Sequence, residues 1–422
     1  MTDRDSPGEA LPRIDPRHLH LREVVERLPS DRPTKDTVEG IREWLMGPAR
    51  RYPSAPRVFD EFAWRVLAAG LPVLRVTLHV GTLHPQYLGA VFTWWRTEGR
   101  TTAIMIAHEI METEEGRNNP VVRVRQGGET LRRSLEGADP VLDFAVLHEL
   151  RAAGVTDYLA LPAASAFGRN YAITYATDRP GGFSDDEVAV MTHLAQYLAV
   201  LVDVFSQRFI ASNLLNAYLG PKTGPRVLAG EIRRGIGEEI TAVLWSSDLR
   251  GFTERSDRLP GARMIAILNA LFDAQAHAIG AHGGEVLKFI GDGLLAIFPI
   301  EDAGFAGVAA RNALEAAQET LVAVERLTDH ESMADEAPLR IVIALHVGKV
   351  IYGNIGAAER LDFTVIGPAV NLVSRIEAVA KAQDLPIVVS DDFARAYGGP
   401  LVSLGQHRLR GLSQPHELFR PG

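Results

Sequence analysis

The chain has 422 residues, of which 46% are hydrophobic and 23% are charged, proportions typical of a globular protein with two or three domains. Its net charge of −9 gives no electrostatic support for a nucleic-acid or anionic-membrane partner. The sequence contains no cysteine, which excludes disulfides, thiolate zinc sites, iron–sulfur clusters and cysteine nucleophiles.

The first forty residues mix both charges with proline and lack an apolar core, so they do not have the pattern of a secretory signal. Apolar runs elsewhere, such as LAQYLAVLVDVF, are shorter than the ~18–20 residues that span a bilayer. We therefore expect a cytoplasmic protein with no membrane span. Residues 1–35 are expected to form a polar tail, flexible and with at most a short helix.

Residues 36–183 are predicted to form a first domain. Helical patterns at 38–45 and 59–69 are followed by strand-like runs such as TTAIMIAHEI and NYAITYAT, an alternation that predicts an α/β or α+β fold. The segment GVTDYLALPAASAFGRNYAITYATDRPGGFSDDEV is similar to the C-terminal part of GAF-type small-molecule sensor domains. That resemblance implies an α/β sensor domain whose signal, a small molecule or a protein, the sequence does not identify.

Four histidines of this first domain require separate consideration: His79, His84, His108 and His148. Their spacing matches no set of metal ligands such as H-E-x-x-H. We expect them to be hydrogen-bonded structural residues, and no ligand follows from them.

Residues 184–236 are predicted to form a helical linker. Ser184 and Glu187 have the spacing of a capping box at a helix N-terminus. Apolar residues then recur at steps of three and four, at Val188, Met191, Ala195, Leu198, Val202 and Phe205. This heptad-like seam favours a helix that pairs with a second copy, although an ordinary amphipathic helix gives a similar stripe.

Residues 237–422 form the second predicted domain. Asp248 directly follows the apolar run ITAVLW, and Asp292 occupies the tip of a predicted hairpin, EVLKFI-GDG-LLAIF. Two such carboxylates can converge on a divalent cation, Mg²⁺ or Mn²⁺, that also binds a substrate phosphate. Taken singly, each aspartate is better explained as a turn residue, and only their combination favours a metal site.

Two further patterns are compatible with phosphate chemistry. The turn Gly251-Phe252-Thr253 follows Asp248 closely and can present backbone N–H groups to phosphate oxygens. Asn371 and Arg375 lie four apart on one predicted helix and share a face. Such an arginine can stabilise charge on phosphorus while the asparagine orients a sugar oxygen; the alternative is a solvated helix face.

Five motifs in order resemble a class III nucleotidyl cyclase catalytic domain: SSDLRGFT, GGEVLKFIGDGLLAIF, ALHVGKVIYGNIG, RLDFTVIGPAVNLVSRIE and HRLRGL. The resemblance covers roughly residues 238–420. It implies an α+β, ferredoxin-like or palm-type domain with a central, mostly antiparallel sheet. It also implies a head-to-tail homodimer with composite active sites at the interface.

By this resemblance, Asp248 and Asp292 bind two divalent metal ions, Mg²⁺ or Mn²⁺. Asn371 and Arg375 correspond to the residues that orient the ribose and stabilise the α-phosphate in the transition state.

The resemblance also assigns the remaining substrate contacts. Lys349 and Arg410 stand where the family has basic residues that contact the phosphates, although lysine is more usual at the second position. Lys288 and Thr364 correspond to the residues that read the base. Lysine can donate to N1 of adenine but not to the N1–H of guanine. Threonine replaces the commoner aspartate and can accept from adenine N6 or donate to guanine O6.

The expected function is therefore an adenylate cyclase that converts ATP to 3′,5′-cyclic AMP and pyrophosphate under the control of an N-terminal sensor domain. A guanylate cyclase and a catalytically inactive module for nucleotide binding or dimerisation remain open. A diguanylate cyclase is a remoter alternative, because Gly-Gly-Glu at 283–285 is only superficially similar to that family's signature.

Overall fold

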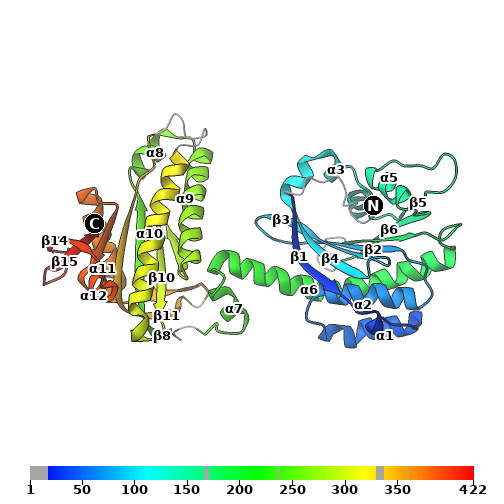
Figure 1. Ribbon diagram of the computed structural model, residues 1–422, viewed down its shortest axis with the longest axis horizontal. Coiled ribbons are helices and arrows are strands. Elements are labelled where there is room, and N and C mark those ends of the chain that lie inside the picture. The colour runs from blue at the N-terminus through cyan, green and yellow to red at the C-terminus, as the bar shows by residue number, and fades with distance from the viewer. Residues whose placement is uncertain (1–17, 166–170, 234, 236, 329–336, 358) are drawn as a thin grey trace, which may run out of the picture. The chain divides into compact units, whose positions relative to one another are not determined.

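The computed structural model describes residues 18–165, 171–233, 235, 237–328, 337–357 and 359–422. The chain divides into two compact units, Met1–Leu214 and Leu215–Gly422, called here the N-terminal and the C-terminal unit. Figure 1 shows that each unit is built around its own sheet.

The N-terminal unit contains seven strands and six α-helices among its described residues. The strands are β1 (Leu19–Glu26), β2 (Arg75–Gly81), β3 (Tyr87–Trp95), β4 (Arg100–Ala107), β5 (Leu131–Ser134), β6 (Asp157–Ala163) and β7 (Tyr171–Thr177). The helices are α1 (Val38–Met46), α2 (Ala55–Ala68), α3 (Glu114–Arg117), α4 (Pro120–Gly127), α5 (Ala145–Ala152) and α6 (Asp185–Leu219).

These strands form one sheet in the order β1-β4-β3-β2-β7-β6-β5, and each pairing between described strands is antiparallel. The unit is therefore of the α+β type, without the parallel pairing of an α/β fold. Part of the expected polar tail of residues 1–35 is instead the strand β1, which pairs with β4 and buries Val25, and residues 1–17 lie outside the described residues. Alternate polar and apolar residues in LHLREVVE explain this edge strand.

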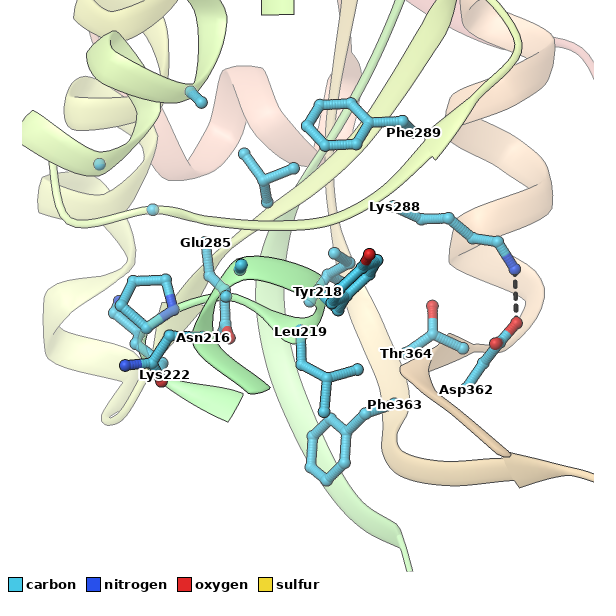
Figure 2. Close-up of a pocket in the computed structure, with 18 residues that line it drawn as sticks. Asn216, Tyr218, Leu219, Lys222, Glu285, Lys288, Phe289, Asp362, Phe363 and Thr364 are labelled. Carbon is cyan, nitrogen blue, oxygen red and sulfur yellow. Dashed lines mark hydrogen bonds and ion pairs between the residues drawn. The ribbon is translucent and has the colours of Figure 1, made fainter. Parts of the chain in front are cut away.

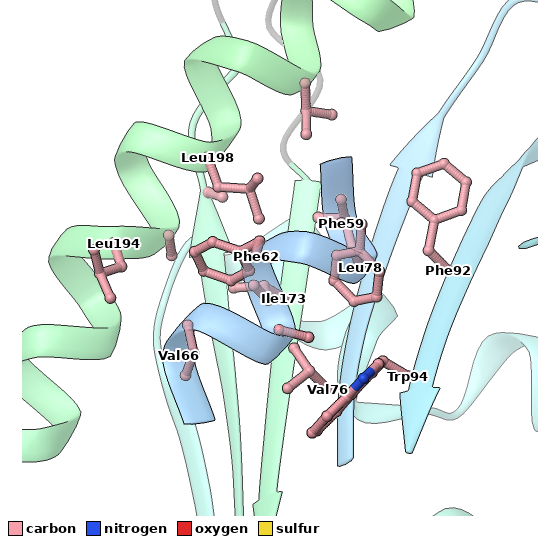
Figure 3. Packing of buried hydrophobic residues seen from close by; sticks show 14 of the residues in the cluster. Phe59, Phe62, Val66, Val76, Leu78, Phe92, Trp94, Ile173, Leu194 and Leu198 are labelled. Carbon is pink, nitrogen blue, oxygen red and sulfur yellow. The ribbon is translucent and has the colours of Figure 1, made fainter. Parts of the chain in front are cut away.

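The two faces of this sheet are covered differently. Helices α1, α2 and α6 pack on one face, where Phe59, Phe62 and Trp94 are fully buried (Figure 3). Residues from α4 and α5 cover the other face and form a smaller cluster that includes Val124 and Leu147. Because side chains alternate along a strand, β2 sends its apolar residues to the first face and its polar residues to the second.

Helix α6 begins with the predicted capping box. The N–H of Ser184 donates to Glu187 Oε2 at 2.7 Å, and the N–H of Glu187 donates to Ser184 Oγ at 3.2 Å. The heptad-like seam is not left free for a partner helix, because Met191, Leu198 and their neighbours are buried in the core of their own unit (Figure 3). Most of the predicted linker thus belongs to the N-terminal unit, since one amphipathic stripe serves either purpose.

The C-terminal unit contains eight strands and six helices among its described residues. The strands are β8 (Gly237–Leu249), β9 (Glu285–Ile290), β10 (Gly293–Ile300), β11 (Ile341–Gly356), β12 (Leu361–Ile366), β13 (Ile387–Ser390), β14 (Leu401–His407) and β15 (His416–Pro421). The helices are α7 (Thr223–Leu228), α8 (Phe252–Arg258), α9 (Gly261–Ala281), α10 (Ala306–Thr328), α11 (Pro368–Gln383) and α12 (Asp391–Tyr397).

The strands of this unit form one sheet in the order β14-β15-β13-β11-β8-β10-β9, and β12 pairs with β11. One described pairing, β11 with β13, is parallel and the others are antiparallel, as predicted for the second domain. Along the central strand β8, Val243 and Trp245 face α9, α10 and α12, whereas Ala242 and Leu244 face α11. Both faces are therefore covered (Figure 1).

Two helices are long and apolar enough to span a membrane by length and composition alone, α6 and α9. Each nevertheless uses apolar residues in the core of its own unit. Helix α6 buries Leu194 and Leu198, and α9 buries Ile267 and Leu271. The structure buries 44% of the apolar window of α6 and 33% of that of α9, and length and composition alone are weak evidence for a membrane span.

Candidate functional site

The two predicted metal-binding aspartates lie at the same end of the central strands. Asp248 is the penultimate residue of β8, only 9% exposed, and lies opposite Gly293 of β10. Asp292 immediately precedes Gly293 in the tight turn from β9, where Gly291 has a φ of +65°. The register of this hairpin therefore brings the two carboxylates together.

The environment of Asp292 disfavours a charged carboxylate. Burial raises the pKa of its carboxyl group. Backbone N–H groups of Asp292 and Leu249 hydrogen-bond to the carboxylate and offset this rise only in part. A carboxylate that is partly desolvated in this way gains from a nearby cation.

The residues present fit a divalent cation. The ammonium group of Lys381 forms an ion pair with Asp248, so this carboxylate already attracts a positive charge. A Cβ atom at residue 293 would lie 2.7 Å from the carbonyl oxygen of Ser247 and 3.4 Å from Asp248 Oδ1, so glycine leaves space beside the carboxylate. Because the described residues hold no cluster of three or more acidic, histidine or cysteine ligands, substrate oxygens and water would have to complete the coordination.

Sequence reasoning missed two residues beside this pair, Glu377 and Lys381 of α11. Glu377 accepts a hydrogen bond from Ser246 Oγ, and its Oε1 lies 3.6 Å from Lys381 Nζ. Burial and the charge of Asp292 raise the pKa of Glu377, against the effect of the Ser246 hydrogen bond. Their i,i+4 spacing was a visible signal, but only the packing of α11 shows which strand end they approach.

The predicted transition-state residues lie elsewhere on α11. Asn371 is exposed and Arg375 is half-buried. A Cβ atom at Gly411 would lie 3.4 Å from a terminal nitrogen of the Arg375 guanidinium, so this arginine lies against the turn between β14 and β15. The preceding residue, Arg410, is exposed in the same turn. The structure therefore places Arg375 against the turn that contains Arg410.

One chain does not bring these residues to the aspartates. Asn371 is ten residues before Lys381, which corresponds to about 15 Å along the helix axis. The Asn371/Arg375 pair also points about a third of a turn away from Glu377 and Lys381. Asn371 and Arg375 therefore point to a different side of α11 from the residues that approach Asp248.

The predicted base-reading residues line a pocket of about 390 Å³ (Figure 2). Lys288 of β9 and Thr364 of β12 approach it from different strands. Lys288 Nζ donates to Asp362 Oδ2 at 2.6 Å, and this hydrogen bond lowers the pKa of Asp362. Sequence reasoning missed Asp362. The available signal was its position two residues before Thr364, on the same face of the strand.

The chain segment that enters the C-terminal unit lines the same pocket, from Asn216 to Lys222 (Figure 2). It is held to β9 by a buried cluster in which Thr223 Oγ1 donates to Glu285 Oε1 at 2.7 Å and the Tyr352 hydroxyl donates to Glu285 Oε2 at 2.9 Å. Burial raises the pKa of Tyr352 to about 12, so its hydroxyl stays protonated at neutral pH. The cluster therefore ties the incoming segment to the strand that carries Lys288.

The other predicted phosphate contacts are more dispersed. Lys349 is exposed, and its Nζ lies 2.8 Å from Glu239 Oε1. It is seven residues along β11 from Val342, the residue opposite Asp248, a separation of about 23 Å in an extended strand. Gly251 adopts a φ of +69° just before α8 and lies close to Asp248 in sequence; Phe252 packs on the core and Thr253 is exposed.

Residues 238–399 match the sequence family described as "Adenylate and Guanylate cyclase catalytic domain". An uncharacterized protein of Mycobacterium tuberculosis is 30% identical over 190 residues, which cover 44% of this chain and 32% of that protein. An adenylate cyclase of Anabaena cylindrica is 31% identical over 157 residues, which cover 36% of this chain and 30% of that protein. The chain thus spans about a third of the length of the curated relatives it matches.

Among solved structures, the guanylyl cyclase Cya2 is similar to this chain with 28% identity and a TM-score of 0.39. That match covers 43% of this chain and 92% of Cya2. The adenylyl cyclase CyaB from P. aeruginosa shows 24% identity and a TM-score of 0.38. That match covers 44% of this chain and 94% of CyaB.

Proposed function

Because residues 238–399 form a domain of the adenylate and guanylate cyclase catalytic family, we propose that the protein is an adenylate cyclase regulated by its N-terminal unit. It converts ATP to 3′,5′-cyclic AMP and pyrophosphate. The observation that carries this proposal is the meeting of Asp248 and Asp292 at one end of the sheet, beside a space that only glycine leaves open.

The reaction needs one bond to form and one to break. The ribose 3′-oxygen forms a bond to the α-phosphorus, the bond from that phosphorus to the bridging oxygen of the β-phosphate breaks, and pyrophosphate leaves. The proton of the 3′-hydroxyl passes to water. Two divalent cations, held by Asp248 and Asp292, would lower the pKa of this hydroxyl and neutralise the leaving group.

The chain's own residues would supply position and charge. Arg375 donates to the α-phosphate as negative charge develops there, and Asn371 orients the ribose. Arg410 and Lys349 attract the phosphates. The turn that contains Gly251, Phe252 and Thr253 presents backbone N–H groups beside Asp248.

We propose that two chains are required for one site. Asn371 and Arg375 are about 15 Å and about 9 Å along the helix axis, and about a third of a turn, from Lys381, the residue of α11 that pairs with Asp248. A head-to-tail dimer with twofold symmetry would place the Asn371/Arg375 pair of each copy opposite the aspartate pair of the other. It would create two equivalent sites.

The choice of adenine follows from Lys288. Its ammonium group can donate to N1 of adenine, and the carboxylate of Asp362 or the hydroxyl of Thr364 can accept from the N6 amino group. A donor placed against the N1–H of guanine would leave two buried donors facing each other.

A guanylate cyclase is the second candidate, and Asp362 is the observation that favours it. Its carboxylate lies 2.6 Å from Lys288 Nζ and can accept from the N1–H of guanine while Lys288 donates to O6. The base pocket therefore offers both a donor and an acceptor, and only nucleotide competition distinguishes the two readings.

We also propose that the protein acts in the cytoplasm, where ATP is available. The burial of α6 and α9 in the cores of their own units supports this location over a membrane-spanning one.

The test supplies the purified full chain with Mn²⁺ or Mg²⁺ and an equimolar mixture of ATP and GTP, followed by chromatographic identification of cyclic products. Cyclic AMP as the main product supports the proposal. Cyclic GMP as the main product supports the second candidate. Asp292→Asn should abolish either product, whereas Asp302→Asn, which alters the acidic residue at the start of a short helical turn, should leave it unchanged. A folded wild-type dimer that makes neither product would favour an inactive module.

A further inference from the structure

The N-terminal unit contains a second pocket, of about 340 Å³, on the face of its sheet opposite to α1, α2 and α6. Its floor is formed by β2, β3 and β4, and its cover by residues of α3, α4 and α5. The polar residues of β2, at the alternate positions Arg75, Thr77 and His79, all line it. A pocket of this size is in the range that binds small organic molecules.

Hydrogen-bond donors gather at one part of this pocket. The Nε of Arg75 is buried without a hydrogen-bond partner, and its guanidinium lies 5.3 Å from the centre of the Trp95 ring. His79 Nε2 lies 3.0 Å from Thr77 Oγ1, which in turn lies 2.6 Å from Thr174 Oγ1. A buried donor without a partner carries a free-energy cost, which a ligand acceptor would remove.

A second arginine approaches from the cover. A terminal nitrogen of Arg125, on α4, lies 2.9 Å from the position that a Cβ atom at Gly81 would occupy. Glycine at the end of β2 therefore makes room for the Arg125 guanidinium against the strand. Arg125 and His79 line the same pocket.

The electrostatic environment at His79 is positive. Burial and the charges of Arg75 and Arg125 lower the pKa of His79 to about 3, so its ring is neutral at physiological pH. Glu149, also in the pocket wall, acts on Arg75, while Glu115 is exposed at the rim. Arg75 and Arg125 are thus the positive groups that act on His79, in a wall that also contains the carboxylates of Glu149 and Glu115.

The rest of the wall is apolar. Branched aliphatic side chains from β3, β4, α4 and the turn before α3 line it, including Val91, Ile104, Ile106, Ile110 and Val121. A ligand that fills this pocket therefore meets cationic donors on one part of its surface and hydrocarbon on the remainder.

We propose that this pocket binds a small organic carboxylate, whose anionic group is held by Arg75 and Arg125 beside His79 and whose apolar body lies against Ile104 and Ile106. Arginine is suited to this role because its planar guanidinium binds carboxylate oxygens in pairs. The proposal concerns the N-terminal unit alone and does not depend on the activity of the other unit.

The test is calorimetric titration of the full chain with two acids, 1-naphthoate and octanoate, each compared with its uncharged amide. The acid and its amide match closely in shape, so a difference between them reports the charge. We expect saturable binding of one site per chain by at least one acid, on the order of tenfold tighter than its amide. Equal affinity of acid and amide, or no saturable binding by either acid, would overturn the proposal.

Variants locate the binding. Arg75→Gln and Arg125→Gln should each weaken the acid on the order of tenfold or more. Arg123→Gln is the matched control, because Arg123 is an exposed arginine on the same helix outside this pocket. Circular dichroism and the melting temperature identify any variant that fails to fold. If one of the two arginine variants is unfolded, the acid affinity of the other variant is used. Unchanged acid affinity in a folded Arg75→Gln or Arg125→Gln variant contradicts the proposal.

Discussion

The two units arrange their charged residues in opposite ways. In the N-terminal unit, Arg75 and His79 of β2 and Arg125 of α4 line one pocket. In the C-terminal unit, the predicted catalytic residues have different neighbours, since Asp248 pairs with Lys381 and Arg375 lies against the turn that contains Gly411. We therefore propose a first site that is complete in one chain and a second that requires another copy.

The charged residues of the two pockets also differ in their exposure to solvent. The Lys288–Asp362 pair leaves about half of each side chain exposed, at 46% and 45%, where water and salt screen its charges. The ring of His79 is instead so strongly desolvated that its pKa falls to about 3. The exposed Lys288–Asp362 pair suits the proposed nucleotide site, which would exchange substrate for product at each turnover. The desolvated surroundings of His79 suit a site that retains its ligand.

The largest expected effect tests the divided site. Arg375→Ala should lower kcat on the order of 10²–10³-fold with a smaller change in KM, because this arginine acts on charge that develops in the transition state. Steady-state kinetics with the preferred nucleotide measures both constants.

Mixing chains then tests the need for a second copy. Arg375→Ala and Asp292→Asn chains, each nearly inactive, should together regain about a quarter of wild-type activity, since half of the dimers are mixed and each mixed dimer holds one intact site. Proven mixed dimers without activity would contradict the composite site.

The next prediction concerns the pocket lined by Lys288 and Thr364. Lys288→Glu should shift the ratio of kcat/KM for ATP over GTP toward GTP on the order of tenfold or more, because glutamate accepts from the N1–H of guanine and repels no donor there. Lys222→Glu is the matched control. Lys222 lines the same pocket, but its ammonium group donates to the carbonyl of Gly283. An equal shift in both variants would show a general charge effect in place of base reading.

A third prediction concerns a buried histidine of the C-terminal unit. Burial lowers the pKa of His346 to about 4, against the opposing charges of Asp392 and Asp391 and with a small further decrease from His416. The unfolded chain therefore binds a proton near pH 6.5 that the folded unit does not bind until about pH 4. The free energy of unfolding should fall by up to about 3 kcal/mol as the pH decreases through this window.

Urea denaturation of the full chain, followed through the transition of the C-terminal unit, measures this dependence. His346→Gln should flatten it, whereas His277→Gln, at an exposed position of α9, should not. The same slope in wild type and His346→Gln would assign the pH dependence to other groups.

The smallest effect concerns the segment that enters the C-terminal unit. Thr223→Val removes the hydroxyl that donates to Glu285 and should lower the free energy of unfolding by about 1–3 kcal/mol, because a buried carboxylate loses a partner. Ser256→Ala, which loses one exposed hydrogen bond to the carbonyl of Thr253, should cost less than about 0.5 kcal/mol. Equal losses would show that the buried cluster does not hold this segment.

Much of the C-terminal unit could be predicted from its sequence, because its signals are local. The Gly-Asp-Gly hairpin, the glycines that follow α9 and the i,i+4 pair on α11 each depend on a few neighbouring residues. The capping box of α6 is predictable for the same reason. By contrast, Asp362 and Lys381 reach their sites from other elements, so no local pattern marks their contacts with Lys288 and Asp248.

By itself, the sequence indicated the resemblance of residues 238–420 to cyclase catalytic domains, the two aspartates beside their glycines and the positions of the principal helices. Only the tertiary structure decided that the seam of α6 packs within its own unit, that β1 completes a sheet, and that Arg75, His79 and Arg125 share a pocket. The physical reason is that periodicity records which side of an element is apolar. What that side contacts is set by the competition for burial among all elements of the fold.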